Sequence, residues 1–174
     1  MVDFYHGIGG SVTTNFKNCK VIVTDKFRVT QKILMSLGQG IPVVSPAWIL
    51  DSSDQGTFLD PWNYILHDQY SEKLFDFDLK STLGRKTDGQ RFLEGFQIYI
   101  SEANKAFHVT ELEEVIKFHG GKIQDDSNDD ALDIAIVENY ENELREMFKE
   151  IDKVKLFNRR LFMSYMLQFK IDIK

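Results

Sequence analysis

The feature that most constrains the fold is an internal repeat with an offset of about 112 residues. Glycine pairs at 9–10 and at 120–121 each precede an apolar, strand-like run. Shifting residues 48–50 (Trp-Ile-Leu) by 112 places them on residues 160–162 (Arg-Leu-Phe). A chain of 174 residues is long enough for two small domains. We therefore interpret the chain as two copies of one structural unit.

The second copy shows the full order of secondary structure. Apolar alternation predicts a strand over 96–101, and strands are also expected at 133–137 and 156–157. Helical spacing of apolar residues predicts three helices, over 110–118, 140–151 and 159–169. Strands that alternate with helices predict an α/β fold. We expect two small three-layer repeats in tandem, each a mainly parallel four-stranded sheet flanked by helices.

The first copy has clear signals for helix starts and stops. We predict a helix over 30–37 that begins at Thr30 and is ended by the two glycines that follow it. Ser45 is a natural N-cap and Pro46 a natural first residue for a second helix. Trp48, inside that second helix, is expected to be a core residue.

The repeat also predicts the domain boundaries. We expect repeats at 1–58 and 91–174, joined by an ordered linker at 59–90 that is rich in aromatic residues. In the second copy the first strand begins about 25 residues before Gly120, and the same count back from Gly9 falls before Met1. Our hypothesis is that the chain is a truncated stretch whose first repeat lacks its first strand.

The charge distribution limits the classes of partner. The net charge is −6; residues 1–60 carry five acidic and five basic residues, and the rest of the chain carries 22 and 16. A nucleic-acid interface needs clustered positive charge, so we expect no direct nucleic-acid binding. No stretch of 18 apolar residues is present, so no membrane interaction is expected. The near-neutral first part leaves room for a local anion site.

Patterns that indicate catalysis or metal binding are incomplete. The acidic stretch 124–130 lacks the glycine and the final glutamate of a calcium loop. The glycine-rich stretch 7–11 is followed by strand-like sequence, whereas a nucleotide-binding loop is followed by a helix. The four histidines show no metal-ligand spacing. We therefore predict no enzyme, no cofactor and no metal site.

Two sequence motifs carry a resemblance to a known family. Residues 30–32 read Thr-Gln-Lys, and residues 40–48 read Gly-Ile-Pro-Val-Val-Ser-Pro-Ala-Trp, followed by an aromatic linker and a second copy. This arrangement resembles the tandem BRCT module of phosphopeptide-binding DNA-damage mediators, found in fungal scaffolds and their animal counterparts. The second copy departs from the family because Arg160 stands where a tryptophan is usual. The resemblance implies a nuclear protein of the DNA-damage response that binds phosphorylated protein or histone tails.

The resemblance also implies a binding site. In that family the first repeat holds the phosphate, and the groove between repeats reads the residue three places later. When these family roles are carried over to this sequence, the resemblance implies that Lys32 is the phosphate-binding ammonium. It also implies that Thr30 caps a helix whose positive end favours an anion. The residues implied for the specificity pocket are Val29, Leu34, Ala106, Phe107, Asn158 and Phe162.

This chain departs from the family at two points of the site. Val29 stands where members that bind a peptide's terminal carboxylate commonly have arginine. The hydroxyl and glycine of the phosphate loop, expected after the first strand, have no matching residues.

Three interpretations of function remain open at this stage. Thr30 alone is typical of a plain N-cap, and Lys32 alone is typical of a solvated side chain; only the BRCT-like context favours phosphate binding. The leading hypothesis is recognition of phosphoserine or phosphothreonine peptides. The alternative is a structural tandem BRCT pair that binds a partner without phosphate. Binding of DNA ends is disfavoured by the acidic charge.

Overall fold

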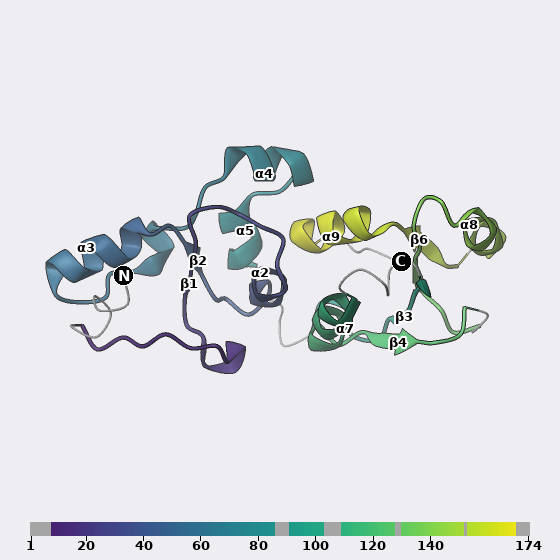
Figure 1. Cartoon of the computed structure of the whole chain (residues 1–174), viewed down its shortest axis with the longest axis horizontal. Coiled ribbons are helices and arrows are strands. Elements are labelled where there is room, and N and C mark those ends of the chain that lie inside the picture. The colour runs from purple at the N-terminus through teal and green to yellow at the C-terminus, as the bar shows by residue number, and fades with distance from the viewer. Residues whose placement is uncertain (1–7, 86–90, 103–108, 128–129, 152, 170–174) are drawn as a thin grey trace. The chain divides into compact units, whose positions relative to one another are not determined.

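The computed structural model describes residues 8–85, 91–102, 109–127, 130–151 and 153–169 (Figure 1). The chain divides into two compact units, Met1–Lys86 and Thr87–Lys174. Of the residues predicted as a linker, 59–86 are grouped with the first unit and 87–90 with the second. The predicted ends of the first repeat at residue 58 and of the linker at residue 90 stay a prediction.

The second unit is built on a parallel four-stranded sheet. Its strands are β3 (Gln97–Ile100), β4 (Lys122–Gln124), β5 (Ile134–Ile136) and β6 (Lys155–Phe157). Their order across the sheet is β4-β3-β5-β6. Ile98 of β3 is in register with Ile123 on one side and Ile134 on the other. The parallel four-stranded sheet predicted from alternation is confirmed for this unit.

Three helices cover the two faces of this sheet. They are α7 (Val109–Phe118), α8 (Asn142–Lys149) and α9 (Arg159–Gln168). Figure 1 shows α8 on one face and α7 with α9 on the other. A side chain added at Gly121 would meet Ile116 of α7 and Ile98 of β3, so helix and sheet are close-packed there. Since successive strand residues point to opposite faces, each strand supplies apolar side chains to both layers.

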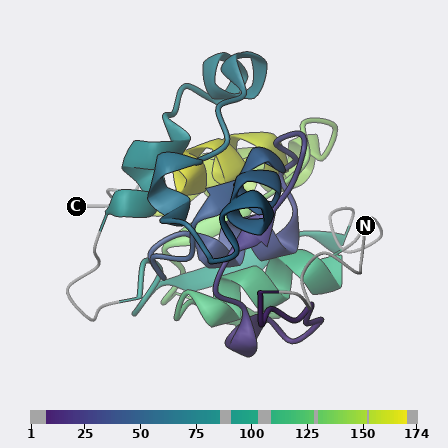
Figure 2. The ribbon, with the colours of Figure 1, turned by 90° about the vertical axis from the view of Figure 1, so that its left-hand side faces the viewer.

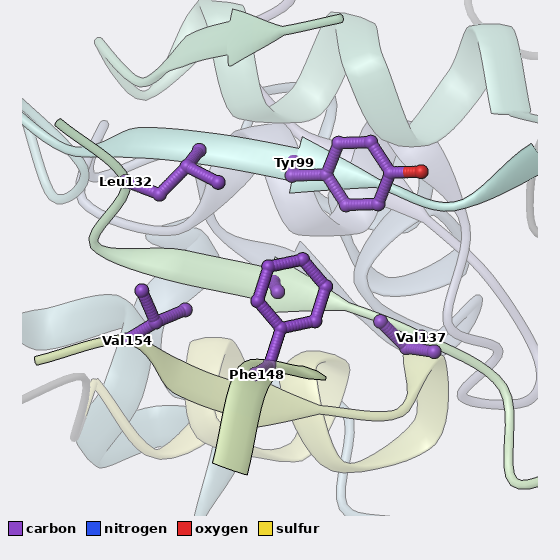
Figure 3. Packing of buried hydrophobic residues seen from close by; sticks show 6 residues of the cluster. Tyr99, Leu132, Val137, Phe148 and Val154 are labelled. Atoms are coloured by element: carbon purple, nitrogen blue, oxygen red, sulfur yellow. The ribbon is translucent and has the colours of Figure 1, made fainter. Parts of the chain in front are cut away.

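The core under α8 consists of six buried residues. They are Tyr99, Leu132, Ala135, Val137, Phe148 and Val154. Figure 3 shows the labelled side chains of this cluster over the strands of the sheet, with the ring of Phe148 of α8 lying among them. The rings of Tyr99 and Phe148 lie 5.7 Å apart between centroids. Burying side chains of this size contributes about 1.5–3 kcal/mol each, which fixes α8 on the sheet.

The first unit has a smaller sheet. β1 (Ile22–Val23) pairs in parallel with β2 (Val43–Val44). Between residues 8 and 85 no further strand joins them, although Ile65 makes an isolated antiparallel bridge to Val44. The segment before β1 contains the short 3-10 helix η1 (Phe16–Asn18). Among the described residues, the second unit has a four-stranded sheet and the first unit a two-stranded one. The parallel pairing and the flanking helices agree with the predicted α/β fold, and residues 8–85 contain two of the four strands expected for a repeat.

Two helices of the first unit follow the sequence signals to different degrees. α2 (Gln31–Ser36) begins after Thr30 as predicted. α3 (Ala47–Gln55) begins one residue later than predicted. Pro46, not Ser45, occupies its N-cap, without a side-chain cap bond. Ser45 instead continues the extended chain after β2, where its N–H donates to the carbonyl of Tyr64 at 3.0 Å.

Trp48 of α3 is a core residue, as predicted. Its side chain is buried and packs in a cluster with Val44 and Ile49. The indole N–H donates to the carbonyl of Leu59 at 2.8 Å, so the polar end of the ring is satisfied.

The linker residues form three helical segments, each opened by an aspartate. The segments are η2 (Pro61–Asn63), α4 (Gln69–Phe75) and α5 (Leu79–Gly84). Their N-caps are Asp60, Asp68 and Asp78, whose carboxylates accept backbone N–H bonds from the first turn. Such caps satisfy N–H groups that have no partner within a helix. In both views α4 lies at the outer edge of the first unit, beyond α5 (Figures 1 and 2).

Candidate functional site

The candidate site is the loop between β1 and α2, residues 24–30, together with the first turn of α2. Thr30 adopts an extended backbone, and its side-chain oxygen accepts the Ile33 N–H at 3.4 Å. The prediction that Thr30 caps this helix is confirmed. Because α2 has six residues, fewer than two turns, the positive end predicted to favour an anion is weak. An anion here needs charged side chains.

Those charged side chains are Lys26, Arg28 and Lys32. All three are exposed. Within the part of the chain that the structure describes, none of the three side chains takes part in a hydrogen bond or an ion pair. Asp25 is the one acidic residue between 24 and 32. A chain of net charge −6 thus presents a locally positive loop.

The backbone of the loop makes a tight turn that begins at Arg28, between the other two cations in the sequence. The Thr30 N–H donates to the carbonyl of Arg28 at 2.8 Å, which closes a three-residue turn with Val29 at its apex. Val29 is half-buried, whereas Arg28 is exposed. A guanidinium therefore lies next to the position where the family commonly has arginine. An ammonium, a guanidinium and a hydroxyl together are suited to a phosphate group.

The residues predicted for the specificity pocket have different environments. Leu34 and Phe162 are 2% and 0% exposed, and Val29 is half-buried. Asn158 caps α9 by accepting the Leu161 N–H at 2.8 Å. Ala106 and Phe107 lie outside the described residues. The pocket stays a prediction.

Asp68 is a residue of the site that the sequence analysis did not single out. Its carboxylate accepts the Ser71 N–H at 3.1 Å and the Phe27 N–H at 3.2 Å. These hydrogen bonds lower the pKa of Asp68 below its ordinary value, and the bond from Ser71 has the largest effect. Burial acts in the opposite direction and raises the pKa, but it is outweighed. An aspartate before an amphipathic segment signals a helix cap. Nothing local signals its bond to a loop 41 residues away.

Features of other classes of site are lacking in the described ranges. Among those residues no group of three or more His, Cys, Asp or Glu side chains is arranged to hold a metal ion. The helices of those ranges are all too short or too polar for a membrane crossing.

Comparison with solved structures decides the fold. The BRCT5-BRCT6 domains of S. pombe Brc1 superpose with a TM-score of 0.79, covering 99% of this chain and 89% of that one at 21% identity. The fold is that of a tandem BRCT pair. A chain of the complex structure of Rtt107p with a phosphorylated histone also matches, at a TM-score of 0.60 and 15% identity, covering 98% of this chain and 81% of that one.

Curated proteins match the tandem BRCT chain over about half its length. Human Mediator of DNA damage checkpoint protein 1 is 39% identical over 94 residues, which are 54% of this chain and 4% of that protein. Mouse PAX-interacting protein 1 is 35% identical over 78 residues, which are 45% of this chain and 7% of that protein. The matches thus span a small part of these relatives. No family model matches the chain.

Proposed function

We propose that this tandem BRCT chain recognises phosphoserine or phosphothreonine peptides through its first repeat. The observation that carries the proposal is the loop 24–30 with Lys32, where three exposed cations have no acidic partner in the described parts of the chain. Lys32 donates charge-assisted hydrogen bonds to the phosphate, and Thr30 orients the start of α2. Support for the ligand class comes from the likeness to a fold solved with a phosphorylated histone.

The likeness to a DNA-damage checkpoint mediator suggests the cellular role. We place the chain in a nuclear scaffold of the DNA-damage response, with a phosphorylated protein or histone tail as its partner. It acts by binding and not by catalysis.

The finer part of the proposal concerns the peptide residue three places after the phosphate. By resemblance to the family, residues of both repeats read this side chain. The residues involved are Val29, Leu34, Ala106, Phe107, Asn158 and Phe162. The half-buried Val29 is the one nearest in sequence to the phosphate-binding residues. An apolar side chain at this peptide position is therefore expected to bind best.

Calorimetry with two matched peptides tests the proposal. One is a histone-tail peptide with a single phosphoserine, and the other is its unphosphorylated twin. We expect at least about tenfold tighter binding of the phosphorylated peptide, a difference of about 1.4 kcal/mol. Equal affinity for the two peptides would contradict phosphate recognition.

A phosphate-independent interaction module is the second candidate. It is favoured by two apolar side chains on the outer helix α4, Tyr70 and Leu74, which are 77% and 43% exposed. They lie four residues apart and so share one face of the helix. This candidate predicts that Tyr70→Ala weakens partner binding equally with and without the phosphate.

A further inference from the structure

The linker of the first unit holds the candidate phosphate-binding loop through one carboxylate. Asp68 accepts two backbone N–H bonds with its two oxygens. Oδ1 accepts from Ser71 in the first turn of α4, and Oδ2 accepts from Phe27 in the middle of the loop. A single side chain therefore joins the start of a linker helix to the loop that carries the exposed cations.

The side chain of Phe27 is held by the same linker. Phe27 is 6% exposed, and its ring lies 5.0 Å from the ring of Phe77, centroid to centroid. Phe77 follows α4, and its N–H donates to the carbonyl of Glu72 at 3.0 Å. Both the backbone and the ring of Phe27 are thus fixed by residues of the linker.

The neighbours of Phe27 are arranged by this anchoring. Lys26 and Arg28, on either side, are exposed. The Lys26 carbonyl accepts the Thr24 hydroxyl at 2.8 Å, and the Arg28 carbonyl accepts the Thr30 N–H at 2.8 Å. With Phe27 held in the middle and these bonds on both sides, the backbone that carries Lys26 and Arg28 is held in place. A preordered loop binds an anion at a lower entropic cost than a loop that must first become ordered.

We propose that Asp68 is a positioning residue for the phosphate-binding loop. The linker then serves the phosphate site as well as joining the repeats. This inference rests on the proposed function, because it names a residue that acts through the loop and not on the phosphate itself. Asp68 is itself negatively charged. If it had no positioning role, removing its charge would be expected to strengthen anion binding.

Asparagine at this position separates the two roles of the carboxylate. An amide oxygen still accepts the Ser71 N–H and caps α4, but the amide nitrogen is a donor and cannot accept from Phe27. Asp78 offers a matched control in the same linker. It caps α5 by accepting the Ser81 N–H at 2.7 Å, and its side chain has no bond to the loop among the described residues.

The experiment compares D68N and D78N in the full 174-residue chain. Affinities for the phosphoserine histone peptide and its unphosphorylated twin are measured by calorimetry, and hydrogen exchange at the Phe27 amide is followed by NMR. We expect D68N to weaken phosphopeptide binding by about fivefold to tenfold, to leave the twin unchanged, and to speed exchange at Phe27. D78N is expected to stay within about twofold of the unaltered chain in every measurement.

The outcomes separate this inference from the proposed function. If the unaltered chain binds both peptides equally, the proposed function fails and this inference fails with it. If the unaltered chain prefers the phosphopeptide and D68N behaves like D78N, the inference alone is overturned. Should D68N lower the unfolding temperature sharply, Phe77→Leu provides a second variant that weakens the ring contact and keeps the carboxylate. It is expected to reduce the preference for phosphate in the same direction, and an unchanged preference would overturn the inference.

Discussion

The starts of α2 and α8 are equivalent positions of the two repeats, yet they differ in charge. Each helix follows the loop after a parallel strand, β1 in the first unit and β5 in the second. The repeat offset of 112 residues aligns Val29 with Glu141 and Thr30 with Asn142. In the first unit this loop carries exposed cations. In the second unit it carries a carboxylate that is already hydrogen-bonded.

Glu141 makes two bonds within the second unit. Its Oε2 accepts the Ser101 hydroxyl at 2.8 Å and the Glu138 N–H at 2.6 Å. Ser101 is fully buried at the end of β3. A hydroxyl at a strand end and a backbone N–H are groups suited to an anion, and here the protein supplies that anion itself. The same fold element thus carries exposed cations in one repeat and a hydrogen-bonded carboxylate in the other.

Lys32→Ala should have the largest effect, because it removes the ammonium that we propose binds the phosphate. We expect phosphopeptide affinity to fall by about 1.5–3 kcal/mol, the range for hydrogen bonds to charged groups. Thermal stability should hardly change, since Lys32 is exposed. Calorimetry with the phosphoserine peptide measures the loss.

Lys73→Ala is the matched control for Lys32→Ala, because it removes an exposed lysine of α4 in the same unit. It alters the net charge equally and should leave affinity nearly unchanged. Equal losses for the two variants would show that the effect is one of overall charge and not of a site.

Glu141→Ala should have the next largest effect. It should lower the stability of the fold and not the affinity for the phosphopeptide. It leaves a fully buried hydroxyl at Ser101 without its carboxylate acceptor, which we expect to cost about 1–2 kcal/mol of the free energy of unfolding. Phosphopeptide affinity should stay unchanged. Urea unfolding of Glu141→Ala, Ser101→Ala and the double variant measures the coupling between the two residues. Additive losses would argue against the bond as a stabilising contact.

Amidation of the peptide's C-terminus should have a smaller effect. The resemblance implies that Val29 stands where members of the family commonly have the arginine that binds this carboxylate. On that basis the affinity of a peptide ending three residues after the phosphate should change by less than about tenfold. A larger loss would identify another cation, and Arg28 is the nearest. Repeating the titration with Arg28→Ala then shows whether the sensitivity to amidation disappears.

Acid below about pH 4 should have the smallest effect. Hydrogen bonds from Ser71 and Ser81 lower the pKa values of the caps Asp68 and Asp78. Their stabilisation is present above the unfolded-state pKa of about 3.9, and it is lost as the pH falls through the lower folded-state values. Since both groups are accessible to water, the loss should stay below about 1 kcal/mol.

Fluorescence gives a selective measurement of this acid effect, because Trp48 and Trp62 both lie in the first unit. The double variant D68N/D78N should show less acid destabilisation by this signal. An identical pH profile for the variant and the unaltered chain would rule out the two caps as the source.

Much of the fold could be predicted from local patterns. Alternation over 96–101 predicted β3, and helical spacing predicted α9 to within a residue at each end. Thr30 was identified as a cap because a hydroxyl before an apolar helix is a local signal. Ser45 was wrong as a cap, because α3 begins one residue later with Pro46 at its N-cap, and the Ser45 N–H forms a tertiary bond to Tyr64. A sequence pattern does not contain that bond.

The sequence by itself determined the α/β character of the chain, its repeat and the position of the cations near Thr30. The α/β character and the cations depend on residues close together in the sequence. The repeat is found by aligning one half of the sequence with the other. Only the tertiary structure decided that Asp68 holds Phe27 and that Glu141 bonds to Ser101. Those partners lie 41 and 40 residues apart. Their meeting depends on how strands and helices pack, since the same side chains at the same spacing would not touch in another topology.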